Sequence, residues 1–193
     1  MGKIGLFFGS FNPIHEGHLS IARYLLDNDY CKSIWLVVSP QNPWKKNREL
    51  LQEQKRLELV RAAIAEDKRM EVCDVEFEMP RPSYTYQTLR KLRADEPERD
   101  FALIIGGDNL KKFQEWKNFQ EILSMHTLFV YPRPGEVLSH TPEGDIVLVD
   151  APQTSISSTE IRQKIEKGMS IVGDVPEIVR ERIEIYYKNQ DLF

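Results

Sequence analysis

The feature that most constrains the fold is a regular alternation of short apolar runs with segments of helical periodicity. Six apolar runs are typical of β-strands, and they cover residues 3–8, 33–39, 70–75, 101–105, 127–131 and 146–149. Most of them are hydrophobic nearly throughout, as strands covered on both faces usually are. The alternation predicts an α/β fold built on a doubly wound parallel sheet with right-handed crossovers.

Helical patterns fill the stretches between the apolar runs. Within one of them Leu57, Val60 and Ile64 recur at helical spacing. The predicted helices cover residues 17–27, 53–65, 85–92 and 113–123 between strands, and residues 158–167 and 176–189 after the last strand. No repeat, low-complexity segment or linker interrupts this order. We therefore expect one domain over residues 1–193, with 156–193 as its helical C-terminal part.

Length and charge exclude several classes of protein. A chain of 193 residues can bury a core without disulfides or a structural metal. Its 26 basic and 30 acidic residues sum to −4, which argues against a protein that grips a nucleic-acid backbone. The apolar runs are too short for a bilayer and do not form a signal peptide, so no membrane association is expected. Without a secretory signal, Cys31 and Cys73 favour a reducing compartment, which predicts a cytoplasmic protein.

The loop after the first strand carries the first candidate site, because ligands of such sheets bind beyond the carboxyl ends of the strands. It reads GSFNPIHEGH over residues 9–18 and leads into a predicted helix. His15 and His18 should share one face of that helix start, where free amides and the helix dipole favour an anion. The loop lacks the lysine of a Walker motif, is not GxGxxG, and spaces its histidines too closely for an HExxH zinc site. A phosphate cradle is expected; the alternative is that each histidine only caps or packs the turn.

A second candidate segment, ISSTEIR, covers residues 156–162 near the other end of the chain. Ser157 or Ser158 can cap the following helix and leave its first amides for a phosphate. Arg162, one turn further on, can reach the same anion with its planar guanidinium. The alternative is a plain capping sequence with Arg162 on a solvated face.

Together the two segments resemble the HxGH nucleotidyltransferase superfamily, whose members transfer a nucleotidyl group from ATP or CTP and release pyrophosphate. Residues 9–18 match its HxGH signature, and residues 156–162 match its ISSTxIR motif. The resemblance implies a Rossmann-like sheet of the nucleotidyltransferase type with a helical C-terminal segment. It also implies an ATP site made of Gly9, Ser10, Phe11, His15, His18, Gly106, Asp108, Ser157, Ser158 and Arg162.

Two further elements narrow the resemblance to nicotinate-nucleotide adenylyltransferases. Residues 82–89 resemble their PSYTxxTL element, and residues 104–110, IIGGDNL, resemble their IIGxDxL element. With the first two motifs, these elements extend the resemblance over nearly the whole chain. It implies that the mononucleotide is bound by Lys45, Ser83, Tyr84, Thr85, Asp108, Trp116 and Arg133.

The chemistry of these residue types suits that substrate. Trp116 can stack on a pyridine ring, and Tyr84 and Thr85 can offer backbone amides and a hydroxyl to the nicotinate carboxylate. Asp108 can accept hydrogen bonds from ribose hydroxyls or help to place a magnesium ion. The alternatives are a core position for Trp116 and simple helix-capping roles for residues 83–85 and for Asp108.

Two departures from the family pattern concern single side chains. The family's PPHK reads NPWKK over residues 42–46, so Trp44 replaces a histidine while Lys45 keeps a cation for a substrate phosphate. The family's GGTFDP reads FGSFNP over residues 8–13, so Asn12 replaces an aspartate. Neither change removes a group that the reaction requires.

The implied reaction joins nicotinate mononucleotide to ATP, giving deamido-NAD and pyrophosphate. The nucleophile is a phosphate that is already ionised, so no general base is needed. Catalysis would consist of positioning for in-line attack and of stabilising charge on the leaving pyrophosphate. The resemblance implies that His15, His18 and Arg162 do this together with Mg²⁺ held mainly by the ATP phosphates, with no metal site of the protein's own.

Other functions are weighed on the same motifs. A relative acting on nicotinamide mononucleotide or phosphopantetheine, or using a cytidylyl donor, would keep the HxGH loop; the elements at residues 82–89 and 104–110 favour nicotinate. A non-catalytic ATP sensor is the alternative from another class, and the histidines and Arg162 argue against it. The sequence leaves the oligomeric state open, a homo-oligomer included.

Overall fold

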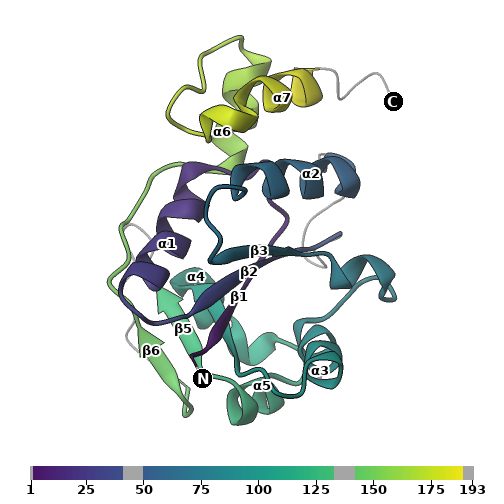
Figure 1. The fold of residues 1–193 in the computed structure, drawn as a ribbon, viewed down its shortest axis with the longest axis vertical. Coiled ribbons are helices and arrows are strands. Elements are labelled where there is room, and N and C mark those ends of the chain that lie inside the picture. The colour runs from purple at the N-terminus through teal and green to yellow at the C-terminus, as the bar shows by residue number, and fades with distance from the viewer. Residues whose placement is uncertain (1, 41–49, 133–141, 189–193) are drawn as a thin grey trace.

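Six parallel strands form one sheet in the computed structural model, which describes residues 2–40, 50–132 and 142–188 (Figure 1). The strand order is β3-β2-β1-β4-β5-β6, and every neighbouring pair is parallel. The strands are β1 (Ile4–Gly9), β2 (Ser33–Val38), β3 (Met70–Cys73), β4 (Phe101–Gly106), β5 (Leu128–Tyr131) and β6 (Ile146–Leu148). The order reverses between β1 and β4, so the predicted doubly wound sheet is confirmed.

The strands form where the sequence can bury both faces of the sheet. In β1, Leu6 belongs to one apolar cluster and the next residue, Phe7, to the other. Leu103 and Ile104 divide in the same way in β4, which is buried along its whole length. Side chains of a strand alternate between its faces, so a continuous apolar run supplies both layers of the core.

Helices cover the two faces separately. On one side lie α1 (Glu16–Asp27) and α2 (Glu53–Ala63), and beyond them α6 (Ser158–Glu166) and α7 (Glu177–Lys188) form the outermost layer in Figure 1. On the other side lie α3 (Thr85–Asp95), α4 (Gly107–Lys111) and α5 (Phe119–Met125). The predicted C-terminal helices are therefore present, and their apolar residues extend the cluster of α1 and α2.

The prediction of one helix over residues 113–123 was wrong. Phe113–Glu115 is a short 3-10 helix, and α5 begins only at Phe119. Between them Trp116 is extended, with ψ of 138°, and Asn118 is left-handed, with φ of 56°. Asparagine tolerates the left-handed conformation better than most residues, so the chain can change direction here. The apolar residues keep their helical spacing across this corner, which is why the sequence pattern does not reveal the break. The sequence analysis also missed the five-residue α4.

None of the helices in the described ranges is long and apolar enough to cross a bilayer.

Candidate active site

The reversal of strand order places two of the predicted motifs side by side. β1 and β4 are hydrogen-bonded neighbours at the centre of the sheet, and each ends in a glycine, Gly9 and Gly106. The loop with the two histidines follows β1, and the segment with Asp108 follows β4. Both loops therefore leave the carboxyl edge of the sheet at its switch point, where doubly wound folds bind ligands.

The loop after β1 folds back tightly over its own strand. A Cβ on Gly9 would lie 2.8 Å from the Phe11 ring, so only glycine fits there. Phe11 itself has a φ of 42° and is almost fully buried, with its ring edge-on to Phe7 and His18. The Phe11 side chain is therefore core beneath the loop, and a contact with ATP would come from its backbone.

The two histidines lie together at the start of α1. His15 is the N-cap, and its ring stacks on that of His18 with 3.6 Å between centroids. The backbone N–H of His15 donates to Nδ1 of His18 over 3.3 Å. A ring nitrogen that accepts does not carry the proton, so in the neutral form of His18 the proton is on Nε2.

Gly17 makes this arrangement possible. A Cβ at residue 17 would lie 2.8 Å from Cγ2 of Thr154 and 3.0 Å from the His15 ring. The absence of a side chain thus lets α1 begin directly against the segment that precedes α6. The glycine of the HxGH pattern has a steric reason in this chain.

The ISSTEIR segment docks on the loop after β1. Ser157 caps α6 by accepting from the backbone N–H of Glu160 at 3.2 Å, whereas the Ser158 hydroxyl donates to the carbonyl of Pro13 at 3.0 Å. Arg162 donates to the carbonyl of Asn12 at 2.9 Å. Two motifs 150 residues apart are therefore joined by direct hydrogen bonds, and a guanidinium is held beside the histidine loop.

Asn12 anchors the same loop from below. Its side-chain oxygen accepts from the backbone N–H of Leu51 at 3.1 Å and from the hydroxyl of Tyr187 at 2.7 Å. Burial raises the pKa of Tyr187, which keeps the proton on the hydroxyl that donates. The amide oxygen accepts both bonds without a charge, which explains how this chain accommodates Asn12 where the family pattern has aspartate.

Arg56 is a supporting residue that the sequence analysis missed. Arg56 is only 1% exposed. Burial disfavours the charged form of a guanidinium, and it lowers the pKa of Arg56 here. It donates four hydrogen bonds to backbone carbonyls, those of Ser10, Ser39, Pro40 and Leu51. One cation thus ties the loop after β1 to the loop after β2. Its spacing of four residues from buried Val60 was the available signal, since it puts residue 56 on the core side of α2.

The segment after β4 presents a carboxylate at the same edge. Gly106 is the N-cap of α4 and is buried, while Asp108 stands exposed in the first turn of the helix. In the described residues, no group of three His, Cys, Asp or Glu side chains could hold a metal ion. Mg²⁺ usually binds through substrate phosphates, waters and one or two carboxylates, and Asp108 is a carboxylate that fits such a shared site.

Ser83 of the PSYT element faces inward. Its hydroxyl donates to Oε2 of Glu76 at 2.9 Å, and the Thr88 hydroxyl donates to Oε1 of the same carboxylate at 2.7 Å. Glu76 is itself buried in the 3-10 helix after β3. These bonds fix the start of α3, where Tyr84 is the N-cap and Thr85 the first helical residue. The first amides of α3 have no acceptor within the helix and are available to a ligand.

Trp116 lies at the corner before α5. It is partly buried against Phe113, with 5.0 Å between ring centroids, so it belongs in part to the core. The next residue, Lys117, places its Nζ 4.7 Å from the centroid of the Tyr84 ring. The corner and the start of α3 are therefore in contact through these two side chains. Lys45 and Arg133, and also Trp44, lie outside the described residues.

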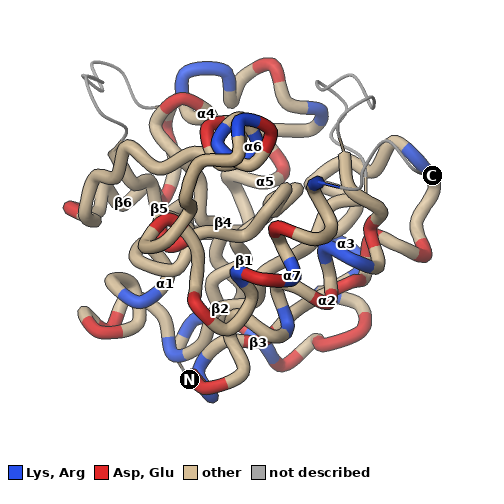
Figure 2. The backbone as a smooth tube through the Cα atoms, turned by 90° about the horizontal axis from the view of Figure 1, so that it is seen from above, with Lys and Arg blue, Asp and Glu red and all other residues tan. Residues whose placement is uncertain are grey.

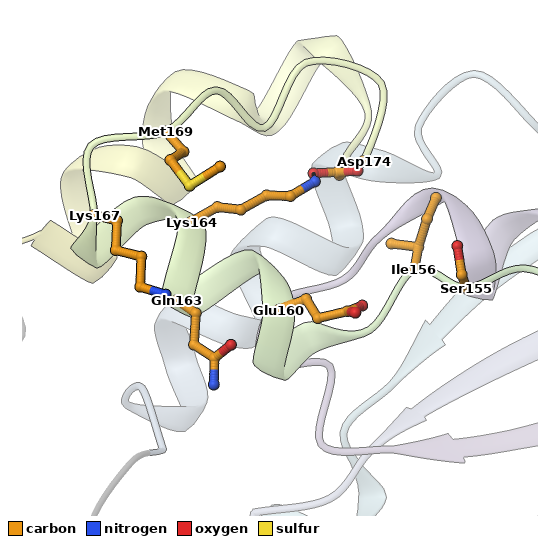
Figure 3. A pocket seen from close by; sticks show the side chains of 8 residues that line it. All are labelled: Ser155, Ile156, Glu160, Gln163, Lys164, Lys167, Met169 and Asp174. Atoms are coloured by element: carbon orange, nitrogen blue, oxygen red, sulfur yellow. Dashed lines mark hydrogen bonds and ion pairs between the residues drawn. The ribbon is translucent and has the colours of Figure 1, made fainter.

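A pocket of about 290 Å³ lies between α6, the segment just before it and the loop that follows it (Figure 3). It is lined by Ser155, Ile156, Glu160, Gln163, Lys164, Lys167, Met169 and Asp174, and none of these is a predicted site residue. Lys164 reaches across it to Asp174 in an ion pair of 2.6 Å. The pocket is thus a neighbour of the switch-point site rather than a part of it.

The positive charge at the site is local. In the view of Figure 2, basic and acidic residues are interspersed along the backbone, and the chain sums to −4. Against this background Arg56 and Arg162 both donate to carbonyls of the loop after β1. Positive charge is therefore concentrated around this loop in two guanidinium groups, of which Arg56 is buried, rather than spread over a broad basic surface.

Comparisons with known proteins show what the whole chain is similar to. The family model described as Cytidylyltransferase-like matches residues 6–164. A protein of Cytophaga hutchinsonii is 46% identical over 97% of this chain and 99% of its own, and one of Flavobacterium johnsoniae is 42% identical over 94% and 96%. Both are named "Probable nicotinate-nucleotide adenylyltransferase". Among solved structures, a similar fold is that of Plasmodium falciparum nicotinic acid mononucleotide adenylyltransferase complexed with NaAD. The two structures have a TM-score of 0.78 and 19% sequence identity, and the match covers 97% of this chain and 98% of that one.

Proposed function

The chain belongs to the nicotinate-nucleotide adenylyltransferases of the cytidylyltransferase-like family, and from this premise we propose how its site performs the reaction. The enzyme transfers the adenylyl group of ATP to nicotinate mononucleotide, a step of NAD biosynthesis. A phosphate oxygen of the mononucleotide attacks the α-phosphorus of ATP, a new P–O–P bridge forms, and the bond to pyrophosphate breaks. The attacking phosphate is already ionised, so the protein has to position and to stabilise charge.

The charge of the reacting phosphates is assigned to the loop after β1 and to α6. His18 would donate from Nε2, with His15 stacked beside it, and Arg162 would place its guanidinium on the same side of the loop. The first amides of α6, beyond the cap at Ser157, would add neutral donors. Gly9 and Ser10 would leave room for the phosphates to approach the backbone.

The mononucleotide is assigned to the opposite side of the switch point. The amides at Thr85 would receive the nicotinate carboxylate, and the ring of Trp116 would stack on the pyridine. Asp108 would accept from ribose hydroxyls. Ser83 would act indirectly, because its hydroxyl is bonded to Glu76. Lys45 and Arg133 would contact the mononucleotide phosphate on the strength of the resemblance alone.

Magnesium is proposed as a partner of the ATP phosphates rather than as a resident of a protein cage. When bound, the ion would neutralise charge on the leaving pyrophosphate. Asp108 is the described side chain that would hold it, through its exposed carboxylate.

We also infer a cytoplasmic location and a single folded unit. The apolar residues of α6 and α7 lie in one cluster with those of α1 and α2, which supports one domain over the whole chain. The expected substrates are small molecules, and the oligomeric state is a matter for measurement in solution.

The observation that carries the proposal is the junction of the two motifs, with Ser158 on Pro13 and Arg162 on Asn12. It is tested by pyrophosphate release from ATP and Mg²⁺, with nicotinate mononucleotide and nicotinamide mononucleotide offered in parallel. Release that is much faster with the acid is expected.

Release that is faster with the amide would retain adenylyl transfer and refute the assignment of the carboxylate to α3. No release with either substrate, together with tight binding of ATP, would favour the sensor. In that case the histidine loop would bind a nucleotide without turning it over.

A further inference from the structure

Lys117, a residue outside all four family motifs, places its ammonium group near the start of α3. Lys117 follows Trp116 at the corner before α5, and its Nζ lies 4.7 Å from the centroid of the Tyr84 ring. Tyr84 is the N-cap of α3, so the ammonium group lies over the residue that precedes the first amides of the helix. Within the described ranges, no carboxylate forms an ion pair with Lys117.

The corner that the sequence did not predict is what puts Lys117 there. In a continuous helix over residues 113–123, the regular helical rotation from residue to residue would set the direction of the residue 117 side chain. Extended Trp116 and left-handed Asn118 instead turn the chain on both sides of Lys117. The break in the helix thus brings a positive charge to the PSYT element.

We propose that Lys117 is a specificity-determining residue, which favours a mononucleotide with a ring carboxylate over one with a carboxamide. This inference rests on the proposed function and deepens it. Backbone amides such as those of Thr85 donate to a carboxylate and to a carboxamide oxygen alike. A cation near the start of α3 stabilises only the ligand that carries the negative charge.

The strength of the present contact allows this role. An exposed ammonium group over a tyrosine ring gains only a modest free energy, so a ligand carboxylate can compete for it. Lys117 is exposed, and its field is therefore screened by salt. A contribution of about five- to ten-fold to the preference for the acid is expected from one cation at such a rim.

The test measures kcat/KM for pyrophosphate release with nicotinate mononucleotide and with nicotinamide mononucleotide, for the full chain and for K117Q, K117R and K117E. In K117Q, kcat/KM for the acid falls about five- to ten-fold through KM, whereas the value for the amide does not fall. K117R keeps the preference because it keeps the charge, and K117E loses more of it than K117Q. Raising the salt concentration reduces the preference of the original protein more than that of K117Q.

K112Q is the matched control. Lys112 is an exposed lysine in the same connection between β4 and α5, so its loss changes the net charge equally. Its acid-to-amide ratio should equal that of the unchanged protein, and melting temperatures should agree across the set. An unchanged ratio in K117Q, or an equal fall in K112Q, overturns the inference while the proposed function stands. Absence of release by the original protein with both substrates refutes the proposed function and the inference with it.

Discussion

At the scale of single residues, the site depends on side chains whose partners are backbone groups. His18 accepts from the His15 amide, Ser158 and Arg162 donate to carbonyls of the loop after β1, and Arg56 donates to carbonyls alone. Because these contacts bind the loop's backbone, they hold its conformation independently of the loop's own side chains. The two motifs that these contacts join could be picked out from the sequence, and the spacing of Arg56 from Val60 was a signal for its position, whereas the support from Glu76 could not be predicted. A charged residue in a short apolar pattern is ordinarily solvated, and nothing in the sequence marks Glu76 as buried.

His18→Asn separates the two roles of the imidazole. The amide oxygen of asparagine can still accept from the His15 backbone N–H, but the Nε2 donor is lost. We expect kcat for pyrophosphate release to fall by about 10²–10³, as for the loss of one donor to developing charge. The melting temperature should stay close to that of the unchanged protein, as measured by circular dichroism.

His126→Gln is the matched control for removing a histidine. His126 is buried in the core, where its Nδ1 contacts the carbonyl of Phe101, far along the sheet from the carboxyl edge. Its replacement should reduce stability and leave kcat nearly unchanged. Full activity of His18→Asn would show that this side chain takes no part in the reaction.

At the scale of secondary-structure elements, the sheet was predictable and one helix was not. All six strands lie within two residues of the predicted bounds, because continuous apolar runs leave few alternatives in a sheet covered on both faces. The helix over residues 113–123 failed because apolar spacing says nothing about the backbone at Trp116 and Asn118. The roles of Gly17 and of the contact between α1 and the segment before α6 also needed the structure.

Gly17→Ala should damage the site more than the fold. The added methyl group would lie 2.8 Å from Cγ2 of Thr154 and 3.0 Å from the His15 ring, so one of these neighbours must move. We expect kcat/KM for ATP to fall at least ten-fold if His15 has its proposed role, since a small displacement of a catalytic group is costly. Steady-state kinetics would measure this fall.

The second variant in this test is Gly17→Ala combined with Thr154→Ser. Serine removes Cγ2 but keeps the hydroxyl oxygen that accepts from the Ile156 backbone N–H at 3.1 Å. Part of the lost activity should return in the double variant. Equal activity of the single and double variants would show that the contact with Thr154 is not what limits this position.

At the scale of the whole molecule, distant parts of the chain are joined under the site. The Tyr187 hydroxyl of α7 donates to Asn12 across 175 residues of sequence, and Arg162 of α6 to the carbonyl of the same residue. On the outside, Tyr186 and Arg182 bond to Glu58 of α2. The helices after β6 are therefore part of the support of the loop after β1. The order of elements could be predicted from the sequence, but this convergence on Asn12 could not, because tyrosines at helical spacing are ordinary core residues.

Tyr187→Phe tests whether α7 supports the loop after β1, and Tyr186→Phe, at the neighbouring residue, is the control. Each variant removes one hydroxyl, from a buried bond to Asn12 or from an exposed bond to Glu58. Loss of the buried bond should reduce the free energy of unfolding by about 1 kcal/mol and the melting temperature by about 2–4 °C. Loss of the exposed bond should change the melting temperature very little.

Activity gives the second measurement for this pair. KM for ATP should rise in Tyr187→Phe, because the loop after β1 loses an anchor, and should not change in Tyr186→Phe. Identical melting temperatures and KM values in the two variants would contradict a special role for Tyr187.

The junction between the loop after β1 and α6 also bears on how the protein is made. A ribosome supplies the loop after β1 early and Arg162 about 150 residues later, which at ordinary rates of synthesis is a delay of roughly 8–30 s. Throughout that interval the nascent chain holds the loop after β1 without the guanidinium of Arg162 and without the hydroxyl of Tyr187. On the proposed assignment, catalytic competence would therefore arrive late in translation, and a chain released before α6 would carry the histidines without the guanidinium assigned to work with them.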